Sequence, residues 1–140
     1  MGTTLFSPEP LTVSDCNANK SKYGITNCYE DEDYWGGAMK ACAEKGMRLP
    51  KSDELAKIAT DVYGTTVGST QNIDSGLTLN ATKVAEYGFR NPSGSRWFSL
   101  WSGQEASVDD AYGLYFSTSG TYWTSLSRTN STRQAVCVPE

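Results

Sequence analysis

Apolar residues recur at helical spacing in the segment 33–45, and their positions there are Trp35, Ala38, Met39 and Cys42. Intervals of three and four residues place these side chains on one face of a helix. Gly46 follows directly, and glycine commonly ends a helix. The sequence therefore predicts a first helix over residues 33–45. Because Gly36 and Gly37 lower its intrinsic helix propensity, packing must stabilise it.

A second helix is predicted over residues 52–63, with Ser52 able to cap its start and Gly64 placed to end it. Its apolar stripe consists of Leu55, Ile58, Ala59 and Val62. The following segment, 65–95, is rich in Gly, Thr, Asn and Ser and is typical of loops. Within it, only residues 84–89 are predicted as a short element.

From Trp97 onward the pattern is one of short strands separated by turns. Residues 97–101 carry large apolar side chains on both faces, which predicts a central strand with Trp97 or Trp101 in the core. In the next strand, alternation assigns the core face to Tyr112, Leu114 and Phe116. Two early helices followed by a run of antiparallel strands predict an α+β fold.

The N-terminal part of the chain gives weaker signals. Residues 1–10 are expected to form a loose, flexible leading segment, because Pro8 and Pro10 discourage a helix. Residues 11–28 are predicted as a short strand or hairpin. The whole segment 11–140 has the length of one domain with a single core.

Four cysteines, Cys16, Cys28, Cys42 and Cys137, suggest two disulfides and an oxidising compartment. None forms a C-x-x-C pair, so zinc or thioredoxin-like chemistry has no support from spacing. Four cysteines allow three different pairings. Cys16 and Cys28 are the nearest partners and flank turn-forming residues, and this choice leaves Cys42 to pair with Cys137.

Charge and composition exclude several function classes. The net charge is −4 and basic residues do not cluster, which argues against nucleic acid. There is no histidine, the commonest general base and metal ligand. The acidic run 30–33 precedes the first helix, where it is better explained by the helix dipole than by calcium. Asp109 and Asp110 are adjacent, which does not suit a paired-carboxylate mechanism. We predict no catalytic residues, no metal and no cofactor.

The run 112–132 consists almost entirely of Tyr, Trp, Phe, Ser, Thr, Gly and Asn, with Arg128 as its only charge. Such a mixture of rings and hydroxyls is typical of a binding face. An ordinary antiparallel sheet of a secreted protein has a similar composition. On the binding interpretation, Trp123 or Arg128 could act as an anchor, and the remaining face residues are predicted to be Asp109, Tyr115, Ser117, Ser119, Tyr122, Thr124, Ser127 and Thr132.

The layout resembles the C-type-lectin-like fold. The resemblance rests on Tyr34-Trp35, Ala38, Cys42, Gly46, Leu49-Pro50, the second helix, Trp101-Ser102-Gly103 and Ala135-Val136-Cys137. In that fold a helix cysteine bonds to the last strand, in agreement with the pairing of Cys42 and Cys137. The cysteines of segment 11–28 would correspond to the added hairpin of the long form.

Two further segments, 46–55 and 101–105, resemble a bacterial family found at the tips of surface adhesins. The C-terminal run is similar to the variable proteins of diversity-generating retroelements, some of which are pilin-like. The Glu-Pro-Asn, Gln-Pro-Asp and Trp-Asn-Asp motifs of calcium-dependent sugar binding are absent, and Asn91-Pro92-Ser93 is the nearest approach. Calcium-dependent sugar binding is therefore disfavoured.

The resemblance implies a surface-displayed recognition module, such as an adhesin or receptor-binding domain, that binds a protein or glycan on another surface. It also implies fusion to or assembly with a pilus, an adhesin stalk or a phage structure. Two alternatives remain: a calcium-independent lectin, and a structural pilin-like subunit. We expect a secreted or cell-surface location, with the export or anchoring segment outside this chain.

Overall fold

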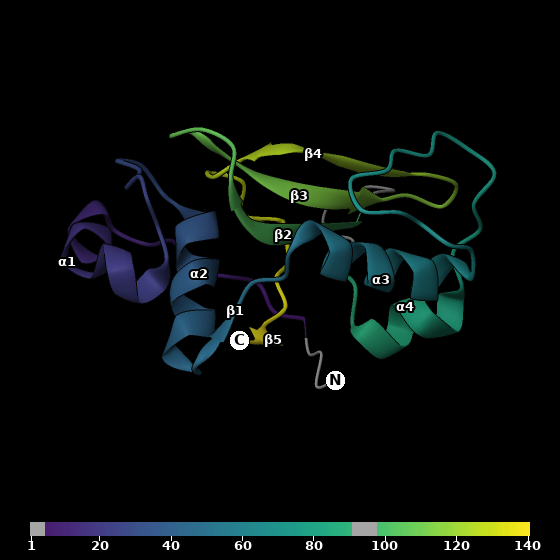
Figure 1. Cartoon of the computed structure of the whole chain (residues 1–140), viewed down its shortest axis with the longest axis horizontal. Coiled ribbons are helices and arrows are strands. Elements are labelled where there is room, and N and C mark those ends of the chain that lie inside the picture. The colour runs from purple at the N-terminus through teal and green to yellow at the C-terminus, as the bar shows by residue number, and fades with distance from the viewer. Residues whose placement is uncertain (1–4, 91–97) are drawn as a thin grey trace.

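The computed structural model describes residues 5–90 and 98–140, and within them the chain forms helices and antiparallel strands (Figure 1). The helices are α1 (Val13–Tyr23), α2 (Tyr34–Glu44), α3 (Ser52–Tyr63) and α4 (Ala81–Tyr87). The strands are β1 (Met47–Arg48), β2 (Phe98–Glu105), β3 (Asp110–Phe116), β4 (Thr121–Ser127) and β5 (Val138–Pro139). Figure 1 shows α1 and α2 at one end of the molecule, and α3 and α4 below the other end of the main sheet. The predicted mixture of helices, antiparallel strands and disulfides is confirmed at this level.

Helix α1 occupies the segment that the sequence predicts as a strand or hairpin, and that prediction is wrong. The Thr12 hydroxyl accepts a hydrogen bond from the Asp15 backbone at 3.2 Å and caps the helix start. Gly24, with φ 73°, ends it in the left-handed conformation. The turn-forming Asn19 does interrupt the helix, with non-helical φ −134° and ψ 24°. Local capping therefore outweighs the turn signals in this segment.

Helix α2 confirms the first predicted helix, and its glycine pair has a packing role. Asp33 caps it, its carboxylate accepting from the Gly36 backbone at 2.8 Å. A Cβ on Gly37 would lie 1.5 Å from the Glu9 carbonyl oxygen. The helix therefore has room for the leading segment only because residue 37 has no side chain. In the same region Phe6 pairs with Ala135, which attaches the leading segment, expected to be loose, to the body of the molecule.

Helix α3 confirms the second predicted helix, whose stripe is buried. The Glu54 carboxylate accepts from the Lys51 backbone at 2.8 Å, so the acceptor at the helix start is Glu54 and not the expected Ser52. Helix α4 begins slightly before the short element predicted over 84–89, and Asn80 caps it by accepting from Lys83 N at 3.1 Å. Instead of two helices, the described residues contain four.

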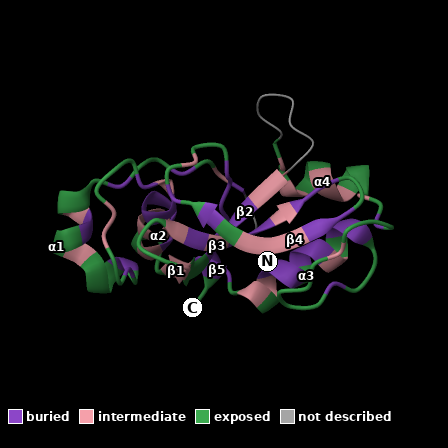
Figure 2. Ribbon diagram, turned by 90° about the horizontal axis from the view of Figure 1, so that it is seen from above, coloured by how far each residue is buried: buried purple, intermediate pink, exposed green. Residues whose placement is uncertain are grey.

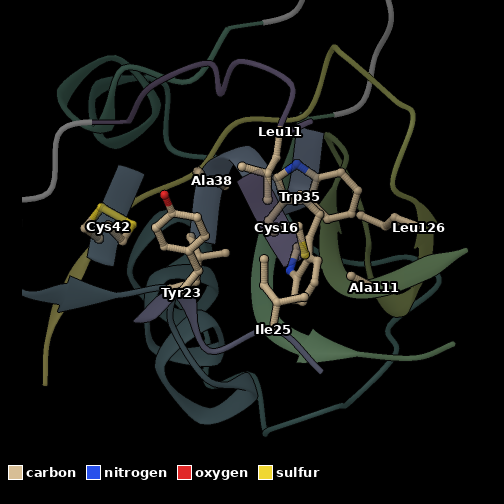
Figure 3. Packing of buried hydrophobic residues seen from close by; sticks show 13 residues of the cluster. Leu11, Cys16, Tyr23, Ile25, Trp35, Ala38, Cys42, Ala111 and Leu126 are labelled. Atoms are coloured by element: carbon tan, nitrogen blue, oxygen red, sulfur yellow. A yellow bond between two sulfur atoms is a disulfide. The ribbon is translucent and has the colours of Figure 1, made fainter. Parts of the chain in front are cut away.

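The main sheet has the strand order β2-β3-β4, and a small second sheet pairs β1 with β5. One face of the main sheet packs against α3 through Leu100, Leu114 and Phe116. The other face contributes Trp101, Ala111 and Leu126 to a second cluster that contains Trp35 of α2 (Figure 3). Burial of Trp101 confirms the prediction that at least one of Trp97 and Trp101 lies in the core. Trp97 and Asn91-Pro92-Ser93 lie outside the described residues.

One core assignment in β3 is wrong. Leu114 and Phe116 are buried as predicted, whereas Tyr112 is only half-buried. The Tyr112 ring lies on the Trp123 ring, with centroids 5.3 Å apart and planes 10° from parallel. The same face of β3 that is buried at Leu114 is therefore partly open to solvent at Tyr112. Figure 2 shows how buried, intermediate and exposed residues alternate along the strands of the main sheet.

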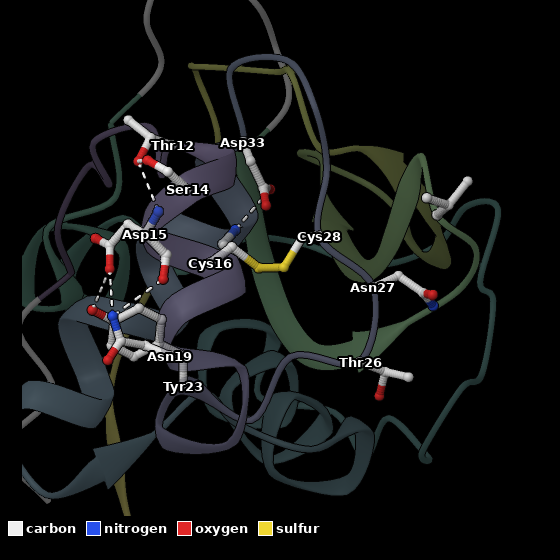
Figure 4. The surroundings of a disulfide bond; sticks show 12 residues. Thr12, Ser14, Asp15, Cys16, Asn19, Tyr23, Thr26, Asn27, Cys28 and Asp33 are labelled. Carbon is white, nitrogen blue, oxygen red and sulfur yellow. Dashed lines mark hydrogen bonds between the residues drawn. A yellow bond between two sulfur atoms is a disulfide. The ribbon is translucent and has the colours of Figure 1, made fainter.

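Both predicted disulfides are present. Cys16 of α1 bonds to Cys28, and their surroundings include the capped start of α1 (Figure 4). Cys42 of α2 bonds to Cys137 next to β5 across 95 residues of sequence. The second bond fixes α2 to the end of the chain, which also pairs with β1 directly after α2.

Candidate ligand-binding site

The candidate site lies at β4, an edge strand of the main sheet. The loop between α3 and α4 fastens to the start of this strand. Ile73 and Thr121 exchange two backbone hydrogen bonds of 2.9 Å, and Leu77 N donates to the Ser119 carbonyl at 3.0 Å. The loop thus covers the beginning of the β4 edge, and the middle of β4 follows directly after the covered part. Figure 1 shows the loop next to the turn between β3 and β4.

A cavity of about 510 Å³ opens where this loop meets the sheet. Among the described residues it is lined by Asn72, Tyr115, Tyr122, Trp123 and Thr124. Its volume is in the range of small-molecule sites. Because consecutive residues of β4 line it and successive side chains of a strand point to opposite faces, the cavity wraps the edge of the sheet.

The lining side chains are held in place before any ligand arrives. The Trp123 backbone N–H donates to the Asn72 side-chain oxygen at 2.7 Å, which connects the loop to the strand inside the cavity. The Trp123 ring is fixed by its stacking on Tyr112. A preformed site of this kind avoids much of the ordering cost of binding.

Tyr115 and Tyr122 are direct cross-strand partners, and their hydroxyls bond to groups of opposite charge. The Arg133 guanidinium donates from Nη2 to the Tyr115 hydroxyl. The Tyr122 hydroxyl donates to the Asp74 carboxylate, and this hydrogen bond raises the pKa of Tyr122. Burial lowers the pKa of the Arg133 guanidinium. The two rings are therefore positioned by a cation on one side and an anion on the other.

Ser117 does not belong to an exposed face, and that part of the prediction is wrong. It is 8 % exposed, and its hydroxyl accepts from the Gly120 backbone at 2.9 Å. The Tyr63 hydroxyl of α3 contacts the carbonyl oxygens of Ser117 and Gly120 at 2.6 and 2.7 Å. The serine therefore shapes the turn between β3 and β4 and anchors it to α3.

Arg128 is likewise not a ligand anchor, because it is fully buried at 0 % exposure. Its guanidinium forms a bidentate ion pair with Asp33, with nitrogen–oxygen distances of 3.0 and 2.5 Å. It also donates to the Asn27 carbonyl at 3.0 Å and lies 4.6 Å from the centre of the Trp35 ring. The sequence indicates Arg128, the only charge in an aromatic and hydroxyl-rich run, as one of two candidate anchors for a ligand. Arg128 instead pairs with the carboxylate that caps α2.

The other predicted residues are exposed and lie away from the cavity. Asp109 and Ser127 are at the opposite end of the β3–β4 hairpin, where Arg128 N donates to the Asp109 carbonyl at 3.0 Å. Ser119 is at the tip of the hairpin turn, and Thr132 follows β4. The structure brings together Tyr115, Tyr122, Trp123 and Thr124, and it separates them from the remaining predicted positions.

Two residues of the site were missed from the sequence. Asn72 belongs to a loop whose composition gives no reason to single out one position, so no local signal could have found it. Arg133 directly precedes the buried segment 134–138, and a lone cation beside an apolar closing segment is a usable signal. Arg133 lies just outside the aromatic run 112–132, so the composition of that run does not indicate it.

Within residues 5–90 and 98–140, no group of three or more His, Cys, Asp or Glu side chains could hold a metal ion. In the same part of the chain no helix has the length and apolar character needed to cross a bilayer. Comparisons of the chain with protein-family models, with curated proteins and with solved structures found no match.

Proposed function

We propose that this chain is a ligand-recognition domain with a C-type-lectin-like fold, displayed on a bacterial or phage surface as an adhesin or receptor-binding module. Its ligand binds in the cavity at the β4 edge. The disulfides support an extracellular location, because such bonds persist in oxidising compartments. Recognition rests on a preformed surface, and the site residues act by contact, not by chemistry.

The fold assignment is supported by the arrangement of the two predicted helices and the chain end. The Cys42–Cys137 bond joins α2 to the C-terminal segment. β1 and β5 pair next to it, in a sheet separate from the three-stranded one. A bond between a helix cysteine and the C-terminal segment is what the resemblance to the C-type-lectin-like fold implies.

The observation that carries the proposal is the convergence of Tyr115, Tyr122, Trp123 and Thr124 on one cavity. The composition and alternation of the sequence predict these residues on a binding face. Large rings supply contact area at low entropic cost, and hydroxyl and amide groups supply adaptable hydrogen bonds. A purely structural subunit has no need for a preformed cavity of this size.

The experiment is a binding array of glycans and surface proteins, probed with labelled protein and two variants. Tyr122→Ser with Thr124→Ala removes cavity contacts, and Ser119→Ala with Thr132→Ala removes predicted residues outside the cavity. We expect the wild type and the second variant to bind the same component, and the cavity variant to lose it by about tenfold or more. Absence of any bound component, or equal binding by the cavity variant, contradicts the proposal.

A glycan is the ligand class that the cavity favours over an extended protein surface. The site is concave and lined by aromatic side chains, against which the apolar face of a sugar ring can stack. This corresponds to a calcium-independent lectin. Glycans bound in the presence of a calcium chelator, with no bound proteins on the array, would support this second candidate.

A further inference from the structure

Arg133 is a buried cation that lies directly behind the cavity. It is 8 % exposed, and its guanidinium carbon lies 5.3 Å from the centre of the Tyr115 ring and 5.5 Å from that of Trp101. Its Nη2 donates to the Tyr115 hydroxyl. Because Tyr115 lines the cavity, one side chain separates the guanidinium from the ligand space.

The charge of Arg133 is not neutralised within the described residues. No carboxylate lies within 4.0 Å of its guanidinium there, and the Arg133 Nε and Nη1 atoms have no hydrogen-bond partner. Burying an unpaired cation has a large desolvation cost. Arg128 differs in this respect, because its buried guanidinium forms an ion pair with the buried Asp33 carboxylate.

Other buried polar atoms without a hydrogen-bond partner lie on the face of the main sheet that carries Tyr115. Trp101 Nε1 and the Ser99 hydroxyl are buried without partners, and with Arg133 they are the only residues in the described part of the chain with such side-chain atoms. Ser99 is the cross-strand partner of Tyr115 on β2, and Trp101 lies two positions further along that strand. All of these atoms can donate a hydrogen bond, and only the Ser99 hydroxyl can also accept one, so the region behind Tyr115 has donors in excess of acceptors.

Asp74 is the charged group on the opposite side of the tyrosine pair. Its residue is exposed and its carboxylate accepts from the Tyr122 hydroxyl. Water and salt screen an exposed charge strongly, and a buried one much less. The electrostatic potential inside the cavity is therefore positive beside Tyr115, because the buried Arg133 charge is screened less than the exposed Asp74 charge.

We infer that the cavity selects a carboxylate-bearing saccharide of the uronic-acid type, whose carboxylate lies beside Tyr115 and is stabilised by the Arg133 charge behind it. This inference rests on the recognition role proposed for the cavity. A buried guanidinium, pre-oriented by a hydrogen bond, favours an anion without reorganising when the ligand arrives. The Tyr122 and Trp123 side chains supply ring contacts, and Asn72 and Thr124 supply polar contacts to hydroxyls.

An acidic saccharide suits the site better than an acidic peptide. The cavity is compact, at about 510 Å³, and is enclosed along one side by the loop that carries Asn72. A peptide chain commonly binds as an added strand along a free sheet edge, whereas this loop already bonds to the β4 edge at Thr121 and Trp123.

The test is an NMR titration of the isotopically labelled wild-type protein with D-glucuronate and with D-glucuronamide, its neutral counterpart. We expect glucuronate to shift the amide signals of the cavity residues and to bind about tenfold more tightly than the amide. Equal affinities, or shifts outside the cavity, overturn the inference. A capped Gly-Glu-Gly peptide that binds the cavity as tightly as glucuronate also overturns it.

Three variants separate the charge from the fold. Arg133→Met should abolish the preference for the acid, and Arg133→Lys should retain part of it. Asp74→Asn, at an exposed position, should strengthen glucuronate binding. If Arg133→Met does not fold, the affinities of glucuronate and glucuronamide for the wild type and for Asp74→Asn still show whether the cavity prefers the acid. Array ligands that bind the cavity while glucuronate does not would overturn the charge selection and leave the proposed function standing.

Discussion

Arg128 and Arg133 lie five positions apart in the sequence, and both are buried, but only Arg128 has a carboxylate partner. Arg128 connects β4 to the start of α2 through Asp33, and it belongs to the scaffold. Arg133 has no such partner in the described residues and lies behind the cavity. Composition alone cannot separate these roles, because the carboxylate that distinguishes them is 95 residues away in the sequence.

Replacement of Arg128 should reveal its structural role. We expect Arg128→Met to lower the free energy of unfolding by about 3–5 kcal/mol, because it leaves the Asp33 carboxylate buried without its cation. The matched control is Lys83→Met, which removes an exposed ion pair with Asp61 at 3.6 Å and should cost less than about 1 kcal/mol. Chemical denaturation measures both, and equal effects would contradict the scaffold role.

The Glu54 carboxylate should contribute to the loss of folding stability at low pH. Its hydrogen bond from Arg48 lowers its pKa below the usual 4.5. A lowered folded-state pKa gives stability that is complete above the unfolded pKa and is lost as the pH falls through the folded value. We therefore expect Glu54→Gln to be less stable than the wild type at pH 7 and to lose less stability below about pH 4.5. Denaturation at a series of pH values tests this, and parallel curves for the two proteins would contradict it.

At the scale of elements, helices were predictable where a continuous apolar stripe faces the core. α2 and α3 have such stripes, and their limits agree with the prediction within one or two residues. α1 has no stripe, since only Cys16 and Tyr23 are buried in it. Its formation depends on caps and on the disulfide to Cys28, and a pattern of hydrophobic positions does not report these. The cavity was only partly predictable, because Asn72 reaches it from a distant loop.

The glycine at position 37 gives a prediction at this scale. Intrinsic propensity alone would make Gly37→Ala more stable by about 1 kcal/mol. The structure predicts the reverse, a loss of about 2 kcal/mol or more, because the new methyl group would collide with the Glu9 carbonyl. Thermal and denaturant unfolding decide the sign. Ala41→Gly on the same helix is the control, and it should lose about 1 kcal/mol through propensity.

At the scale of the whole molecule, the two disulfides differ in how much chain they constrain. Cys42–Cys137 closes 95 residues and Cys16–Cys28 closes 12. Loop-closure entropy assigns about 5 kcal/mol to the longer loop and about 3 kcal/mol to the shorter one. We expect the Cys42→Ala, Cys137→Ala double variant to be the less stable of the two disulfide deletions. Equal unfolding free energies would show that chain entropy does not dominate.

The molecule as a whole combines a scaffold whose early and late segments are joined to each other with a cavity at one sheet edge. The disulfide between Cys42 and Cys137 and the pairing of β1 with β5 close the scaffold near the chain end. The cavity is lined in part by Asn72 of the loop between α3 and α4. Figure 1 places that loop at the end of the molecule away from α1 and α2. The closing contacts and the cavity lining involve different residues.

The most direct test of the central claim is amide chemical-shift mapping with the tightest ligand found on the array. We predict that the largest shifts fall on Asn72, Tyr115 and residues 122–124, which line the cavity. Shifts concentrated instead at Asp109 and Ser127, at the opposite end of the hairpin, would contradict the assignment of the β4 edge as the recognition site.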